Sequence, residues 1–169
     1  IFIEPGLGFG TGLHPTTQLC LAALARTRLR GGRIDRVLDY GSGSGILGIA
    51  AAVLGARQVD AVEIDDRVHP AIVANARRNG VAARLRVATA TSADTPAYDV
   101  VMANIVPQVL LDHAADLCGR LAPRRGTILL SGFFAADVPR LTARYAPLLG
   151  CLPCVHDLGD WRCLSFTRD

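Results

Sequence analysis

The sequence has no lysine, so all of its basic residues other than histidine are arginines. Its formal net charge is only +3, and arginines such as Arg26, Arg57, Arg84 and Arg140 are scattered along the chain. Scattered positive charge is typical of a mixed, solvated surface and not of the basic stripe that binds nucleic acid. No apolar run approaches the ~20 residues that cross a bilayer, and no secretory signal is visible. We therefore expect a protein that binds neither nucleic acid directly nor a membrane.

The sequence also lacks the cysteine pattern of a disulfide framework. Its five cysteines are odd in number and irregularly spaced, which favours a reducing compartment, and we expect a cytoplasmic location. Cys151 and Cys154 form a lone C-x-x-C pair, and only His156 follows them closely. A structural zinc ion needs more ligands than this, so we predict no metal site.

Short apolar runs rich in β-branched residues alternate with longer segments of helical periodicity. This alternation predicts an α/β, doubly wound sheet that is mostly parallel, with helices on both faces. We expect strands at residues 37–40, 59–64, 85–87, 98–105, 127–131, 151–158 and 161–167, and helices at 44–54, 65–79, 107–121 and 137–146. The last two of these seven strands flank Gly159-Asp160, which predicts an antiparallel hairpin.

A glycine-rich turn follows the first expected strand and carries the strongest chemical signal. Gly41, Gly43 and Gly45 alternate with serines between that strand and the next helix. Glycines are needed where the backbone adopts a positive φ, or where a ligand must approach without meeting a Cβ. A tight turn alone accounts for one glycine but poorly for three. We therefore predict that Gly41 and Gly43 contact a cofactor.

Acidic residues follow the second expected strand, where Glu63 is 22 residues after Gly41 and Asp65 comes shortly after it. Ends of adjacent parallel strands lie side by side above the crevice where ligands bind. A carboxylate at this place can accept two hydrogen bonds from a ribose diol. We therefore assign Glu63 and Asp65 to cofactor binding, against the alternative of a strand-end charge that reaches solvent.

A nicotinamide dinucleotide site is the rival interpretation of the glycine turn. Residues 43–48 formally match G-x-G-x-x-G, but the first glycine of that fingerprint should stand at the strand-to-loop turn, which Gly41 occupies. Asp39 also fits a cofactor with a positive amino group and sulfonium better than one with two phosphates. We therefore count Asp39 among the cofactor-binding candidates.

Asn104 ends the fourth expected strand with a polar side chain after an apolar run. That strand adjoins the first in this architecture, so Asn104 should point at the reacting centre. The alternative is that Asn104 caps the helix that begins near Pro107.

Residues 9–17 are rich in glycine and threonine. Thr16 or Thr17 can cap the helix that follows, which is the ordinary explanation. The functional one is a lid over the amino-acid end of a cofactor, and it makes Phe9, Thr11 and Thr17 candidates for cofactor binding. We expect residues 1–16 to form this linker and lid.

Five segments together resemble the catalytic domain of the ribosomal protein L-eleven methyltransferase (PrmA) family. They are PGLGFGTGLHPTTQLCL (5–21), VLDYGSGSGILGIAA (37–51), VEIDD (62–66), VVMANIV (100–106) and DWRCLSF (160–166). The resemblance covers essentially the whole chain, and it implies a class I methyltransferase fold with S-adenosylmethionine as cofactor. By position, the family's cofactor contacts fall on Thr17, Gly41, Glu63 and Asn104. Family members usually have aspartate at the place of Glu63, whose extra methylene moves the carboxylate.

By this resemblance, the methyl acceptor is an amine of a protein substrate, namely lysine side chains or the N-terminal amine of ribosomal protein L-eleven. The Asn104 side-chain oxygen and the Ile105 carbonyl would orient that amine, so we predict both residues to be catalytic. The family's N-terminal recognition domain is absent from residues 1–169, which are expected to form the methyltransferase domain. The alternatives are a same-fold methyltransferase for another protein, RNA or a small molecule, an NAD-dependent oxidoreductase, and a module that binds the cofactor without turnover.

Overall fold

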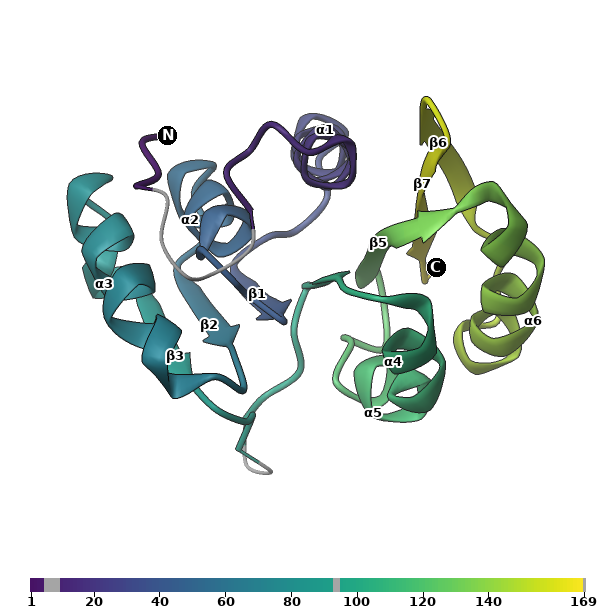
Figure 1. Ribbon diagram of the computed structural model, residues 1–169. Coiled ribbons are helices and arrows are strands. Elements are labelled where there is room, and N and C mark those ends of the chain that lie inside the picture. The colour runs from purple at the N-terminus through teal and green to yellow at the C-terminus, as the bar shows by residue number, and fades with distance from the viewer. Residues whose placement is uncertain (5–9, 93–94, 169) are drawn as a thin grey trace.

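The computed structural model describes residues 1–4, 10–92 and 95–168, and Figure 1 shows its strands joined in one sheet. This sheet has seven strands in the order β3-β2-β1-β4-β5-β7-β6. The strands are β1 (Arg36–Tyr40), β2 (Gln58–Val62), β3 (Leu85–Ala88), β4 (Val100–Asn104), β5 (Thr127–Phe134), β6 (Cys154–Leu158) and β7 (Trp161–Thr167). The first five run parallel, whereas β7 is antiparallel to both β5 and β6. The predicted fold class and the closing hairpin are confirmed.

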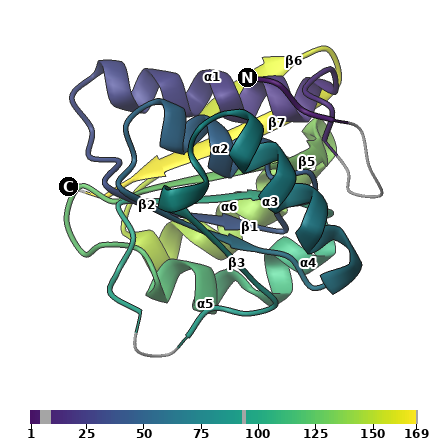
Figure 2. The same cartoon turned by 90° about the vertical axis from the view of Figure 1, so that its left-hand side faces the viewer.

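Helices cover both faces of the sheet (Figures 1 and 2). One face carries α1 (Pro15–Leu29), α2 (Ile46–Val53) and α3 (His69–Arg78), and the other carries α4 (Pro107–Asp112), α5 (Ala114–Gly119) and α6 (Val138–Leu149). Three short 3₁₀ helices complete the described elements: η1 (Asp66–Val68), η2 (Ala82–Arg84) and η3 (Ala135–Asp137). Because the central strands are buried on both faces, they lack an exposed polar face: β4 is apolar up to Asn104, and β1 buries Asp39 between apolar residues. Every helix in the described ranges is too short or too polar to span a bilayer.

The cap of α1 differs from the prediction. The N-cap is His14, whose Nδ1 accepts a hydrogen bond from the Thr16 amide at 3.4 Å, and both threonines lie inside the helix. Pro15 explains the early start, because its fixed φ suits the first helical position and its missing N–H is not needed there. Thr16 and Thr17 are consequently buried and turned inward.

Two helix predictions near the carboxyl half also need correction. The helix expected from residue 107 to 121 is broken at His113 into α4 and α5, and Leu121 lies outside both. Pro147 does not end the last helix, which continues to Leu149 before Gly150 adopts a left-handed conformation. Burial of Tyr145 and Leu149 on one face stabilises this last turn more than the missing proline N–H destabilises it.

The order of the strands determines where a site can form. β1 lies between β2 and β4, and the chain leaves the sheet on opposite faces from β1 and from β4. Their carboxyl ends therefore border one crevice, the usual ligand position in an open parallel sheet.

Candidate functional site

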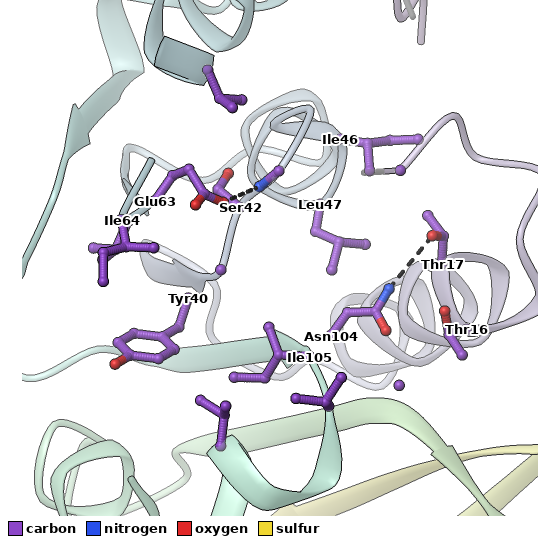
Figure 3. A pocket seen from close by; sticks show the side chains of 18 of the residues that line it. Thr16, Thr17, Tyr40, Ser42, Ile46, Leu47, Glu63, Ile64, Asn104 and Ile105 are labelled. Carbon is purple, nitrogen blue, oxygen red and sulfur yellow. Dashed lines mark hydrogen bonds between the residues drawn. The ribbon is translucent and has the colours of Figure 1, made fainter. Parts of the chain in front are cut away.

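A cavity of about 870 Å³ opens at the carboxyl ends of β1, β2 and β4. This volume lies within the range of small-molecule sites, roughly 300–1,000 Å³. In Figure 3, Glu63 and Ile64 lie on one side of the cavity and Asn104 and Thr17 on the other, with Leu47 between them in the view. The site residues predicted from the sequence that line it are Thr17, Gly41, Gly43, Glu63, Asp65, Asn104 and Ile105.

The glycine turn forms the floor of the cavity and has the backbone that its sequence predicts. Gly41, Gly43 and Gly45 have φ values of +73°, +55° and +83°, which other L-residues rarely adopt. The amide of Gly41 donates to the Val62 carbonyl at 2.8 Å, so the turn is tied to the end of β2. A Cβ at Gly41 would also overlap the Ile105 side chain. The first glycine stands directly after β1, as the argument against a dinucleotide fingerprint requires.

Asp39 lies beneath this turn and is not among the residues that line the cavity. Its Oδ2 accepts hydrogen bonds from the Ser42 hydroxyl at 2.7 Å and from the Gly48 amide at 2.9 Å. Burial is the main cause that raises the pKa of Asp39 to about 6, and these two hydrogen bonds oppose the increase. The Asp39 carboxylate therefore holds the turn to α2, and it lies outside the lining of the cavity where its contact with a positive cofactor group was expected.

Glu63 and Asp65 stand side by side at the end of β2. The Glu63 carboxylate accepts from the Gly43 amide at 2.9 Å and from the Asp65 amide at 3.1 Å, which fixes its direction against the turn. The Asp65 side chain instead caps η1 and forms an ion pair with Arg67 at 2.7 Å, which lowers the pKa of Asp65. Both residues line the cavity, but the Asp65 carboxylate is already paired with the Arg67 guanidinium.

Asn104 carries an unusual buried acceptor. Its Nδ2 donates to the Thr17 hydroxyl at 3.5 Å, a long contact that joins β4 to α1 (Figure 3). Its Oδ1 is buried and has no hydrogen-bond partner within the described part of the chain. An unsatisfied buried polar atom costs about 1–3 kcal/mol, so this oxygen is suited to a donor that a ligand supplies.

Gly132 positions the backbone beside Asn104, and sequence reasoning missed it. This residue lies at a β-bulge in β5, with a φ of +99°, and it lines the cavity. A Cβ at this position would lie 2.8 Å from the Ile105 carbonyl carbon and would overlap its oxygen. The only signal in the sequence is a glycine near the end of an apolar strand, and this signal does not reveal that the glycine packs against the Ile105 backbone.

The N-terminal segment reaches the turn at Gly10, whose carbonyl accepts from the Ser44 hydroxyl at 2.5 Å. Gly10 and His14 line the cavity. Thr11 is exposed and is not among the lining residues, and its contact with the cofactor stays a prediction. Phe9, also predicted to contact the cofactor, lies outside the described residues.

Aromatic side chains that were not predicted complete the wall. Trp161 lines the cavity and packs against the rings of His14 and Phe134. Tyr40 lines it from β1, and its hydroxyl lies 3.1 Å from Nδ1 of His113. Burial is the main cause that raises the pKa of Tyr40. Within the described ranges, no three His, Cys, Asp or Glu side chains come together in a way that could hold a metal ion.

Comparisons with known proteins agree with this geometry. Residues 1–169 match the family model described as "Ribosomal protein L11 methyltransferase (PrmA)". A ribosomal protein L11 methyltransferase from Methylococcus capsulatus is 46% identical over 144 residues, which cover 85% of this chain and 48% of that protein. The solved structure of a ribosomal protein L11 methylase from Lactobacillus delbrueckii subsp. bulgaricus superposes with a TM-score of 0.84 at 29% identity, covering 99% of this chain and 84% of that one.

A more distant solved structure shares the fold. An RNA methyltransferase from Salinibacter ruber, in complex with S-adenosyl-L-homocysteine, superposes with a TM-score of 0.64 at 23% identity over 86% of this chain and 90% of that one. The family model and the curated relatives are methyltransferases, so they do not support the alternative of an NAD-dependent oxidoreductase. The chain spans about half the length of the curated relatives it matches. The model match over the whole chain and the identity to these relatives establish that the chain belongs to the ribosomal protein L11 methyltransferase (PrmA) family.

Proposed function

We propose that this chain transfers methyl groups from S-adenosylmethionine to amino groups of ribosomal protein L11. Family membership supports the reaction class, and one observation within the site carries the proposal for an amine acceptor. That observation is the buried Asn104 Oδ1, which lacks a hydrogen-bond partner within the described residues and stands at the cavity edge of β4. An N–H of an acceptor amine is the donor that this oxygen needs. The cytoplasmic location expected from the cysteines belongs to the same proposal.

The residues present fit the cofactor. The turn at Gly41 and Gly43 brings bare backbone to the cavity, where a side chain would exclude a nucleoside. The Glu63 carboxylate, already oriented by two backbone amides, can accept hydrogen bonds from ribose hydroxyls. Thr17 and Asn104 lie across the cavity, where they would hold the amino-acid end. When bound, the cofactor supplies a methyl carbon made electrophilic by a positive sulfur.

The acceptor nitrogen attacks with its lone pair, so it must be neutral when the N–C bond forms and the C–S bond breaks. Deprotonating a lysine ammonium at neutral pH costs about 4–5 kcal/mol, from a pKa near 10.4 at ~1.36 kcal/mol per unit. Removal from water lowers that cost because it destabilises the charged form. Asn104 Oδ1 and the Ile105 carbonyl then accept the N–H bonds and direct the lone pair towards the cavity. The principal contribution of these residues is positioning.

No side chain of the site is assigned as a general base. His14 is the nearest to that role, but its Nδ1 faces the Thr16 hydroxyl at 2.8 Å and caps α1. The surplus proton of the acceptor therefore passes to water in this proposal. Its role as the N-cap of α1 is sufficient to explain why a histidine stands at position 14.

Incubation of the purified chain with methyl-labelled S-adenosylmethionine and ribosomal protein L11 tests the proposal. Label should enter L11 on amino groups identified by mass spectrometry, and the Asn104→Ala variant serves as the matched control. The longer relative from Methylococcus capsulatus provides a positive control. Label in ribosomal RNA or in a small molecule, but not in L11, would replace the acceptor while keeping the cofactor. Failure of calorimetry to detect cofactor binding would refute the site itself.

A further inference from the structure

The β5–β7 ribbon extends beyond the end of β4 and forms one wall of the cavity. Asn104, the last residue of β4, is paired with Ser131, whereas the ribbon continues to the pair formed by Phe134 and Trp161. Trp161 and Asn104 both line the cavity, as does the N-cap residue of α1, His14. An aromatic ring therefore lines the cavity that Asn104 also lines, at a ribbon pair three β5 residues beyond the one beside Asn104.

The Trp161 ring is held in place by two other rings. Its centroid lies 4.1 Å from that of Phe134, with planes tilted by 33°, and 4.7 Å from that of His14 in an edge-on arrangement. Trp161 is only partly buried, so part of the indole remains available to a ligand in the cavity. A large ring that needs no reordering is a favourable anchor for a partner side chain.

Charge is distributed unevenly around the cavity. Among its described lining residues, the carboxylates are Glu63 and Asp65, both at the end of β2, and no arginine lines it. Glu63 is held by backbone amides and Asp65 by Arg67. At the Trp161 end, a positive group would thus meet an indole ring and no carboxylate among the described lining residues. A carboxylate would bind an ammonium group tightly and oppose its deprotonation, whereas an aromatic face attracts it only moderately.

We propose that Trp161 is a specificity-determining residue that packs on the alkyl stem of the acceptor side chain and receives its cationic amine before transfer. This inference rests on the proposed function and names the acceptor class that the site selects: an alkylammonium side chain. Trp161 makes this contact with one ring face, while Phe134 and His14 hold the ring.

Trp161 is the only tryptophan of the chain, so its fluorescence reports directly on this contact. The probes are ribosomal protein L11 with its lysines reductively dimethylated, which keeps their charge, and L11 with its lysines acetylated, which removes it. Each is titrated into the chain saturated with S-adenosylhomocysteine, and an L11 blank is subtracted. The dimethylated protein should change the emission and bind about 2- to 30-fold more tightly than the acetylated one, as a cation–π contact predicts.

Kinetics of three variants complete the test. Trp161→Leu should raise the KM for L11 by about 2- to 30-fold without changing the Kd for S-adenosylhomocysteine, and Trp161→Phe should recover most of the loss. Leu158→Ala is the control, because Leu158 pairs with Trp161 on the neighbouring strand but does not line the cavity. Thermal unfolding shows whether Trp161→Leu has lost its fold. If it has, the KM for L11 of Trp161→Phe, compared with that of the wild type, still tests the role of the ring.

The two proposals fail in different ways. If the chain methylates L11 but neither the emission nor the KM depends on Trp161 and lysine charge, the role of Trp161 is refuted and the function stands. If L11 receives no label, the proposed function fails. If, in addition, the Trp161 emission changes with neither the dimethylated nor the acetylated L11, the role of Trp161 is refuted as well.

Discussion

Replacing Gly132 with alanine should disable methyl transfer while leaving a folded protein that binds cofactor. The new Cβ would overlap the Ile105 carbonyl oxygen and would lie 2.8 Å from its carbon, whereas ordinary contact begins near 3.4 Å. The two backbones must therefore separate by more than about 0.6 Å, because the carbonyl oxygen lies closer still. A misplacement of about 1 Å can reduce a rate by about 10²-fold, so we expect turnover to fall by about ten- to a hundredfold.

A matched control separates this effect from backbone strain. Gly55 has a φ of +109°, close to the +99° of Gly132, but a Cβ there would have no heavy atom within 4 Å among the contacts considered. Alanine at either position should cost roughly 1–3 kcal/mol of unfolding free energy, because a non-glycine residue is strained at such a φ. Only Gly132→Ala should also displace Ile105.

Both variants would be examined by denaturant unfolding, by calorimetry with S-adenosylhomocysteine and by turnover with L11. We expect a larger loss of stability in Gly132→Ala, because the overlap adds to the backbone strain, together with similar Kd values and a loss of turnover confined to Gly132→Ala. Equal turnover in the two variants would contradict the argument that Gly132 exists to let the Ile105 backbone approach.

Three further predictions concern the other walls of the cavity. Asn104→Ala should lower turnover by about 10²-fold, the usual cost of losing one preorganised polar partner, and should raise the cofactor Kd measured by calorimetry by a smaller factor. Glu63→Ala should weaken cofactor binding by about ten- to a hundredfold, the value of a charge-assisted hydrogen bond, whereas Asp65→Ala should change the Kd less because Arg67 occupies that carboxylate. The pKa of Asp39 is raised to about 6, so the folded state binds its proton more tightly than the unfolded state does. Relative to Asp39→Asn, the wild type should lose unfolding free energy on the order of 3 kcal/mol as the pH rises from about 4 to about 6, measured by urea titrations. A pH-independent difference between the two proteins would contradict a buried carboxylate with a raised pKa.

The part of the site that could be predicted is encoded over short distances in the chain. The strand, the glycine turn and the acidic strand end lie within residues 37–65, and each has a local requirement for its residue type. Gly41 needs a positive φ, and Glu63 follows a buried strand that must lie beside β1. Asn104 could be placed for the same reason, because an amide after an apolar run has to emerge at the carboxyl edge of the sheet.

The residues that sequence reasoning missed or misplaced depend on contacts between distant segments. Gly132 is needed only because the backbone of Ile105 passes beside it, and Trp161 reaches the cavity only through the register of β7 against β5. Asp39 is the reverse case. An acidic residue beside the glycine turn suggested a ligand contact, but its carboxylate accepts hydrogen bonds from the Ser42 hydroxyl and the Gly48 amide. Burial decides between these roles, and the sequence pattern alone does not reveal it.

This division of the cavity has a functional consequence. The wall that holds Gly41 and Glu63 is built by one contiguous unit, β1-α2-β2, whereas the wall that holds Asn104 and Trp161 is assembled from β4, β7 and the start of α1. In the proposed function, the first unit holds the nucleoside end of the methyl donor, whereas the second holds its amino-acid end and positions the acceptor, and the long Asn104–Thr17 contact lies within this second unit. Mutations in the first unit should therefore act mainly on cofactor Kd, and mutations in the second mainly on turnover and acceptor KM. A double variant that combines Glu63→Ala with Trp161→Leu should therefore show additive losses in free energy, since its two changes lie in different walls.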